Sequence, residues 1–281
     1  MHNPELSEQE QIRRNSLEEI KKLGINPYPP ELYEISHSTA EIKAGFKENE
    51  DALKDVSLAG RIMSRRIMGS ASFAEIQDSS GRIQIYLRRD DVCPGEDKTL
   101  YNTVFKKLLD IGDIIGIRGY AFKTQVGEIS VHVEELVLLS KSIRPLPIVK
   151  EADGKVYDAV TDAEYRYRQR YVDLIVNPQS RELFRKRTQI YTSLRNLFNE
   201  KGYLEVETPL RIPTPIPEAH IDSVPSGRWY LAASPEQCMK RLLAQCGVHL
   251  YQICRSFRHE ERGHRHLPEF TLLEWYHVGG N

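Results

Sequence analysis

The sequence has no long apolar run. Over its 281 residues there is no window of about 18 uninterrupted apolar residues, the length that a membrane-spanning helix requires. The first residues, MHNPELSEQEQIRR, are polar and acidic, unlike a secretory signal. These absences exclude both a transmembrane helix and an export signal, so we expect a cytoplasmic protein without a membrane partner.

Cysteine is scarce, and its spacing shows neither a disulfide framework nor a zinc motif. The four cysteines contain no CxxC pair: Cys93, Cys238, Cys246 and Cys254. We expect reduced thiols that are mostly buried. His259, His264 and His266 lie close together but lack cysteine or carboxylate partners at tetrahedral spacing, so we predict no metal site in this chain.

An excess of one charge is also absent, because 39 basic side chains face 40 acidic ones. This balance excludes a uniformly basic protein but hides local differences. Residues 1–56 carry 7 basic and 12 acidic side chains, whereas Leu58–Asp90 carries six arginines against three acids. A local surface for nucleic acid therefore stays possible beside an acidic N-terminal arm.

The N-terminal arm, residues 1–56, is predicted to be mainly helical. Residues 5–23 have a thin apolar stripe of helical spacing, which ends at Gly24 before several prolines. A second, short helix is expected near Ser38–Phe46. Such a narrow stripe indicates a helix that lies on another surface and does not form a core of its own.

Residues 57–147 change to the two-residue alternation of β-strands. The predicted strands and the single helix are Leu58–Ile67, Ser72–Gln77, Arg82–Arg88, the helix Thr99–Leu109, Asp113–Phe122 and Glu128–Leu139. Three strands, one helix and two strands is the order of a five-stranded OB barrel. The outer face of this barrel commonly binds single-stranded nucleic acid.

A linker at 148–161 is expected to lead to a second domain at 162–281, of α+β type. A long helix from Pro178 to about Lys201 is predicted to bury Phe184, Tyr191, Leu194, Leu197 and Phe198. The remaining predicted elements are a strand at 205–209, a proline-rich loop, a strand at 229–233, a helix at 235–244 and two antiparallel strands at 250–258 and 269–276.

The last two strands carry a dense set of polar residues. Arg258 and Glu260 lie at the tip, His266 just beyond, and Phe270 and Glu274 on the returning strand. An arginine binds phosphate or carboxylate oxygens in bidentate fashion, and an aromatic ring offers a stacking face for adenine. The pattern suits a nucleotide and a carboxylate, although an exposed hairpin with solvated charges would give the same spacing.

Several segments resemble class II lysyl-tRNA synthetases. GYLEVETP is similar to their motif 1, and YQICRSFRHEERGHRHLPEFTLLEWY is similar to their motif 2. GRIMSRRIMGSASFAEIQDSSGRIQIYLRRDD, GEISVHVEELVLLSKSIRPLP and DAEYRYRQRYVDLIVN extend the resemblance over nearly the whole chain. The resemblance implies an OB barrel that binds the anticodon of tRNA(Lys), followed by an antiparallel-sheet catalytic domain. It also implies a homodimer across motif 1, with Gly202 and Pro209.

The resemblance further implies a lysine–tRNA ligase that uses ATP and Mg²⁺. Lysine would first become lysyl-adenylate and then pass to the 3′-terminal ribose of the tRNA. By similarity, Arg258 would act in catalysis by holding the α-phosphate and the lysine carboxylate. The implied ATP-binding residues are Arg258, Glu260, His266, Phe270 and Glu274. The implied lysine-binding residues are Ser234, Glu236, Arg258 and Tyr276. The implied anticodon-binding residues are Arg66, Phe73, Gln84 and Glu128.

The sequence departs from this family at three places. PTPIPEAH replaces a glycine-rich loop. From about Leu210, the sequence resembles that of the paralogue that attaches lysine to elongation factor P. Leu267 stands where the family has asparagine, and Asn281 precedes any motif 3. We therefore expect the N-terminal part of a longer protein, catalytically incomplete on its own. Lysylation of elongation factor P and a non-catalytic tRNA-binding role stay open as alternatives.

Overall fold

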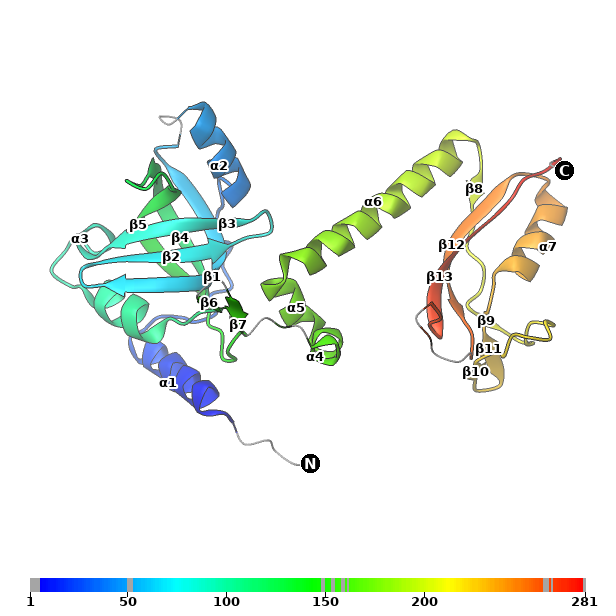
Figure 1. Cartoon of the computed structure of the whole chain (residues 1–281), viewed down its shortest axis with the longest axis horizontal. Helices are drawn as coiled ribbons and strands as arrows, with labels where there is room; N and C mark the ends of the chain where they lie inside the picture. Colours follow the sequence, from blue (N-terminus) through cyan, green and yellow to red (C-terminus); the bar gives the residue numbers. More distant parts are fainter. Residues whose placement is uncertain are drawn as a thin grey trace. The chain divides into compact units, whose positions relative to one another are not determined.

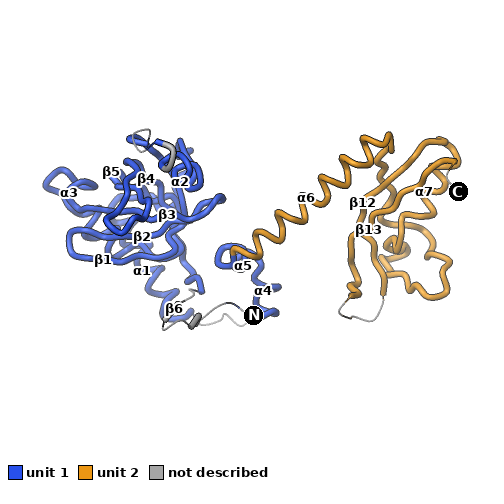
Figure 2. Tube along the Cα trace, turned by 45° about the horizontal axis from the view of Figure 1, so that its top comes forward, with its two compact units in different colours: residues 1–177 blue, residues 178–281 orange. Residues whose placement is uncertain are grey.

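The computed structural model of the chain divides into two compact units. Unit 1 comprises residues 1–177 and unit 2 comprises residues 178–281 (Figure 2). The residues that the structure describes are 6–49, 53–147, 150–152, 155–157, 160, 162–259, 263 and 265–279. Each unit is described by itself below.

Two capped helices form the N-terminal arm, as predicted. They are α1 (Glu8–Lys22) and α2 (Thr39–Glu48) (Figure 1). Ser7 and Ser38 each accept a hydrogen bond from the backbone N–H of a glutamate three residues later, whose carboxylate bonds back to the serine N–H. Both helices contribute to the barrel core, because Ile20 of α1 and Ile42 of α2 are fully buried there.

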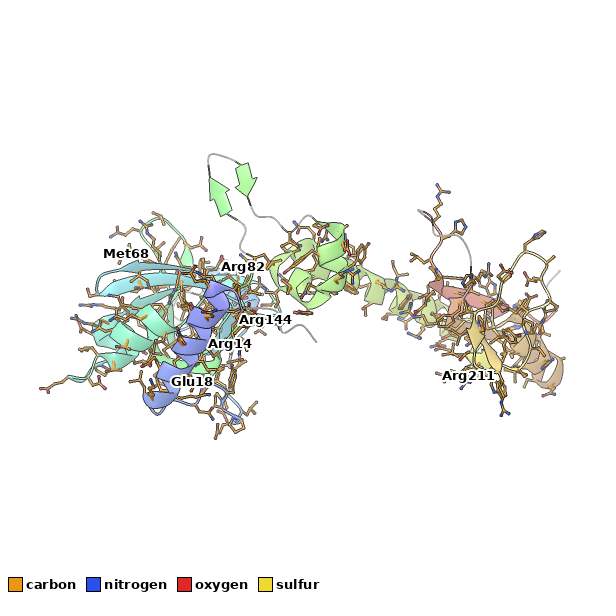
Figure 3. All side chains as sticks on the ribbon, turned by 90° about the horizontal axis from the view of Figure 1, so that it is seen from below. Arg14, Glu18, Met68, Arg82, Arg144 and Arg211 are labelled. Carbon is orange, nitrogen blue, oxygen red and sulfur yellow. The ribbon has the colours of Figure 1, made fainter. Side chains whose placement is uncertain are left out.

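The five barrel strands confirm the predicted OB topology. They are β1 (Val56–Met68), β2 (Ala71–Gln77), β3 (Arg82–Arg88), β4 (Ile114–Lys123) and β5 (Ile129–Ser140). They close in the order β1-β2-β3-β5-β4, and β1 pairs with β4 to complete the barrel. Figure 3 labels Met68 and Arg82, which lie at opposite ends of the β1–β3 meander. Alternate residues such as Ile83 and Ile85 fill the interior.

The predicted helix between β3 and β4 forms, but as a π-helix. A short helix α3 (Arg89–Val92) precedes η2 (Leu100–Leu108), whose last bond runs from Leu109 N–H to Val104 O. Tyr101, Val104 and Phe105 are buried in the core. The apolar spacing predicted a helix here but could not distinguish the wider winding.

A buried ion-pair network ties the end of β5 to the loop before β4. The Lys141 ammonium lies 3.1 Å from Asp113 and 2.6 Å from Asp110. The side chains of Lys141 and Asp113 are both 0% exposed. The Lys141 backbone carbonyl accepts a hydrogen bond from the hydroxyl of Tyr28, at 2.9 Å, and so fastens the arm to the barrel.

The predicted linker is not devoid of structure. It holds a two-stranded hairpin, β6 (Lys150–Ala152) and β7 (Lys155–Tyr157), followed by α4 (Ala163–Arg168) and α5 (Arg170–Val176). The sequence analysis did not predict either helix, because both are short; α4 buries no residue, and α5 buries only Val172, Asp173 and Val176. The buried Asp173 carboxylate accepts hydrogen bonds from Arg166, at 2.9 Å, and Arg170, at 2.8 Å.

Unit 2 begins with the predicted long helix, α6 (Pro178–Glu200). Two residues beyond it, Gly202 has a φ of +75°, which glycine adopts readily. The predicted burial of its apolar residues is largely wrong. Phe198 is buried and stacks on Tyr251 with ring centroids 4.7 Å apart, but Phe184 and Leu197 are each 45% exposed. Arg187 and Tyr191, in the middle of the helix, bond to Thr271 of β13 through their side chains, but most apolar residues of the helix stay partly or largely exposed, so periodicity overstated its core face.

The remaining elements of unit 2 are short, except for one hairpin and one helix. They are β8 (Leu204–Glu205), β9 (Arg211–Ile212), β10 (Pro225–Ser226), β11 (Trp229–Leu231), α7 (Glu236–Cys246), β12 (Leu250–Phe257) and β13 (Glu269–Tyr276). One sheet has the order β13-β12-β8 and the other β10-β11-β9. The predicted antiparallel hairpin is confirmed, whereas β9 and β10 form where the sequence indicated a loop.

The expectation of mostly buried cysteines is wrong. Of the four thiols, only Cys93 is buried, and it lies in the barrel core. Cys246 is exposed at the end of α7, and Cys238 and Cys254 are half-buried. The cysteines of unit 2 lie on a helix and a sheet that bury only part of their surface, which composition does not reveal.

Candidate functional site

A groove of about 1100 Å³ runs along the outer face of the barrel in unit 1. All four side chains that the sequence predicted to read an anticodon line it: Arg66, Phe73, Gln84 and Glu128. The strand register explains this convergence, because Arg66 of β1 pairs with Phe73 of β2 and Gln84 of β3 pairs with Glu75 of β2. Glu128 lies at the turn between β4 and β5.

Aromatic rings form a row across the groove. Phe73 lies 5.0 Å from Tyr86, and Tyr86 lies 6.0 Å from Phe122, measured between ring centroids. All three rings line the groove and are half-buried. Sequence reasoning assigned only Phe73, although the alternation of β3 had placed Tyr86 on the same face as Gln84. Such a row can stack unpaired bases.

The polar groups of the groove are held by neighbours. The Ser130 hydroxyl donates to the Gln84 amide oxygen at 2.9 Å. The Lys43 ammonium, from α2, lies 3.8 Å from the Glu128 carboxylate. Glu75 accepts a hydrogen bond from Arg82 at 3.2 Å. The groove thus combines stacking faces with amide and carboxylate groups that can bond base edges.

A second cluster lies on one face of the β12–β13 hairpin in unit 2. The register places Phe270 opposite Ser256, Glu274 opposite Gln252 and Tyr276 opposite Leu250. Alternation puts these residues on one face, while Tyr251 and Trp275, on the other face, contact Phe198 of α6. On the first face, Gln252 and Ser256 of β12 are buried, whereas Phe270, Glu274 and Tyr276 of β13 are half-buried, so β13 supplies the accessible groups of this polar hairpin face.

Arg258 stands where β12 ends. Its backbone N–H donates to Pro268 O at 2.9 Å, which holds the two strands together before the tip. Its guanidinium lies 5.3 Å from the centre of the Phe270 ring and donates to Ala233 O at 3.3 Å. The strand, the ring and the Ala233 loop therefore fix the position of this positive charge.

Two carboxylates adjoin that loop. Glu274 accepts hydrogen bonds from Ser234, at 3.1 Å, and from Tyr276, at 2.6 Å. The Glu236 N–H donates to the Ser234 hydroxyl at 3.1 Å, and the Glu236 carboxylate contacts the Lys240 ammonium. Burial and the Glu274 carboxylate raise the pKa of Tyr276, so its hydroxyl stays a proton donor at neutral pH.

The structure brings together five other predicted residues near Ser234, namely Glu236, Arg258, Phe270, Glu274 and Tyr276. His266 is exposed, and its backbone exchanges two hydrogen bonds with Gly263, each at 3.3 Å. Glu260 lies outside the described residues. Pro209 is exposed after β8.

The described residues contain no group of three or more His, Cys, Asp and Glu side chains placed to hold a metal ion. Among the same residues, no helix is long and apolar enough to cross a membrane.

Family models match both units. Residues 56–139 match the OB-fold nucleic acid binding domain, and residues 162–278 match the tRNA synthetases class II (D, K and N). The chain therefore contains an OB-fold domain and a class II tRNA synthetase domain. The barrel and the polar hairpin face described above are thus the two parts of a synthetase that these models cover.

Curated relatives of this synthetase chain carry the name lysine–tRNA ligase. It is 53% identical to one from Porphyromonas gingivalis over 97% of its length, which covers 48% of that protein. It is 52% identical to one from Azobacteroides pseudotrichonymphae over 96% of its length, covering 55% of that protein. One from Christiangramia forsetii is 48% identical over 97% of the chain, covering 48% of that protein. The chain therefore spans about half the length of these relatives, and the likeness continues past Leu210.

Proposed function

We propose that this chain acts in lysine–tRNA ligation. In this proposal, the groove of unit 1 binds the anticodon loop of tRNA(Lys), and the polar hairpin face of unit 2 binds lysine and ATP. The observation that carries the proposal is the set of two carboxylates and one guanidinium around Ser234, in a chain whose relatives are named lysine–tRNA ligases.

The charges of this cluster complement lysine. The amino acid carries two ammonium groups and one carboxylate, and the cluster offers Glu236 and Glu274 for the first and Arg258 for the second. We assign the α-ammonium to Glu236 and the ε-ammonium to Tyr276 beside Glu274. Hydrogen bonds between charged partners are stronger than neutral ones, so a smaller or uncharged side chain would bind less well.

The proposed first step is attack of the lysine carboxylate on the α-phosphorus of ATP. A bond forms between a carboxylate oxygen and that phosphorus, and the bond from the phosphorus to the bridging oxygen breaks to release pyrophosphate. The carboxylate is already ionised at neutral pH, so this step requires no general base. Arg258 would orient both reactants and offset the negative charge that builds at the phosphorus. Phe270 would stack on adenine, with Glu260, His266 and Glu274 completing the ATP site.

In the second step, the 3′-terminal ribose hydroxyl of the tRNA attacks the lysyl carbonyl, and AMP leaves. ATP would supply the energy of both steps as a substrate. Mg²⁺ would enter with the ATP phosphates, because the described residues contain no group of three or more His, Cys, Asp and Glu side chains that could hold it.

Two further assignments belong to this proposal. The exposed apolar residues of α6, Leu183, Phe184, Ile190 and Leu197, favour a homodimer across motif 1, whose helix ends at Gly202 before Pro209. A reaction that consumes tRNA and ATP favours the cytoplasm. The domain limits that we propose are 1–56, 57–147, 148–161 and 162–281.

Lysine-dependent exchange of pyrophosphate into ATP, measured with the natural protein that contains this chain, tests the proposal. We expect Arg258→Ala to abolish exchange and Phe73→Ala to leave it intact. Phe73→Ala should instead weaken tRNA binding by about 1–3 kcal/mol, the cost of losing one base stack. Equal loss of exchange in both variants would contradict the division into two sites.

The acceptor is tested by offering the adenylate either tRNA or elongation factor P. We expect labelled lysine on the tRNA. Labelled lysine found only on elongation factor P would contradict tRNA ligation and support the paralogous reaction, lysylation of elongation factor P. Absence of any lysine-dependent exchange would leave a non-catalytic tRNA-binding protein.

A further inference from the structure

We propose that Ser130 is a positioning residue that fixes the Gln84 amide, so that the groove presents N–H donors and selects a 4-keto pyrimidine over a 4-amino one. This inference deepens the proposed nucleic-acid-binding function of unit 1 and rests on it. It concerns a side chain that does not itself face the groove.

Ser130 is a fixed point in the barrel wall. It lies on β5, in parallel register with Gln84 on β3, and its side chain is fully buried. Gln84 is half-buried and lines the groove. The two strands hold both backbones, so the hydroxyl can act on the amide without any movement of the sheet.

The hydrogen-bond geometry determines which end of the amide faces the groove. The Ser130 hydroxyl donates to Gln84 Oε1 at 2.9 Å, and its other acceptor is Glu128 O at 3.4 Å. If the amide were reversed, its nitrogen would donate to the hydroxyl oxygen. The hydrogen of the Ser130 hydroxyl would then be left with only the 3.4 Å bond to Glu128 O. The observed orientation is therefore favoured.

The consequence is a donor aimed at the ligand. With Oε1 engaged by Ser130, the amide nitrogen carries two N–H groups, and within the described part of the chain it has no hydrogen-bond partner. Uracil offers carbonyl oxygens at positions 2 and 4, whereas cytosine carries an amino group at position 4. A donor that faces a donor leaves both unpaired, which disfavours cytosine.

The aromatic row cannot supply this selection. Phe73 and Tyr86 offer π faces that stack every base with similar strength. Discrimination must therefore come from polar groups such as Gln84, and its direction depends on how the amide is turned.

Binding of hairpin RNAs tests the inference. One RNA has a loop of uridines, and the others have a single loop uridine replaced by cytidine; fluorescence anisotropy measures their affinity for the chain. We expect the native chain to prefer the uridine loop, and Ser130→Ala to reduce this preference by about 2-fold to 10-fold, the worth of one hydrogen bond. Ser130→Cys keeps the shape but weakens the donor, so a smaller reduction is expected.

A double-mutant cycle separates positioning from other effects. Gln84→Leu should itself remove the preference, and Ser130→Ala should change it no further in that background. Ser72→Ala is the matched control, because Ser72 is a fully buried serine on β2 that bonds to Tyr101 at 2.7 Å. Ser72→Ala also loses a buried hydroxyl group, but it should keep the native preference for the uridine loop.

The outcomes are distinct. An unchanged preference in Ser130→Ala, or an equal fall in affinity for both RNAs, overturns the inference while the groove keeps its proposed function. Failure of the native chain to bind either loop overturns the proposed function itself.

Discussion

The buried Lys141–Asp113 pair gives a prediction about stability whose magnitude depends on pH. Lys141→Met removes the ammonium and leaves the Asp113 carboxylate buried, with backbone N–H bonds from Asp110 and Ser142, each at 2.7 Å. Breaking a buried pair by removing one partner typically costs 3–5 kcal/mol. Because these two bonds still hold the carboxylate, we expect the lower end, about 3 kcal/mol of unfolding free energy at neutral pH.

Burial raises the pKa of Asp113 above its ordinary value, and Lys141 opposes that rise. A carboxyl with a raised folded-state pKa stabilises the fold at low pH, and this contribution is lost as pH rises through the folded pKa. Removing Lys141 raises that pKa further. The loss of unfolding free energy in Lys141→Met, relative to the native chain, should therefore become smaller as pH falls from neutral toward about 4, the ordinary aspartate range.

Denaturant titrations at several pH values, with hydrogen exchange of barrel peptides read by mass spectrometry, measure this deficit. Both tryptophans, Trp229 and Trp275, lie in unit 2. The unfolding transition that their fluorescence reports should therefore be the same in Lys141→Met as in the native chain, and it serves as an internal control. Arg118→Met breaks an exposed pair with Asp55 and should change stability little. A deficit that grows on acidification, or none at neutral pH, would refute the reasoning.

Two further substitutions test contacts in each unit. Gly116→Ala would place a methyl group 2.6 Å from the Tyr33 ring, so we expect the arm around Tyr33 to be cut faster in limited proteolysis; an unchanged rate would argue against this packing. Tyr276→Phe removes the donor to Glu274, and we expect the KM for lysine in pyrophosphate exchange to rise about 2-fold to 10-fold with the KM for ATP unchanged. A change in the ATP value instead would place Tyr276 in the nucleotide site.

The barrel could be predicted from sequence because its strands obey a local rule. Alternation of buried and exposed residues on β2 and β3 is unbroken, and the turn Asp78–Gly81 separates them. Motif resemblance then supplied Phe73 and Gln84, and the register brought them together. Tyr86 and Phe122 were not predicted as site residues, although alternation places Tyr86 on the same face as Gln84, because the motif resemblance assigned no role to either ring.

In unit 2, the sequence indicated elements more reliably than their burial. The periodicity of α6 is real, but how much of a helix is covered depends on the length of the sheet beneath it, and β8 has only two residues. Helices α4 and α5 were not predicted because they are too short to show a periodic pattern. Their packing combines the buried Val172 and Val176 with a buried carboxylate that has two arginine partners.

The polar partners that orient functional groups are the features that the sequence predicts least well. In the sequence, Gln84 and Ser130 are separated by the helices α3 and η2 and the strand β4, and Ser234 and Glu274 are separated by the helix α7 and the strand β12. No local pattern links such pairs, since each depends on strand register at one face. Yet these contacts decide whether an amide presents donors or acceptors and how a carboxylate is held. Motifs therefore predict which residues gather at a site, whereas the hydrogen-bond network determines what that site can select.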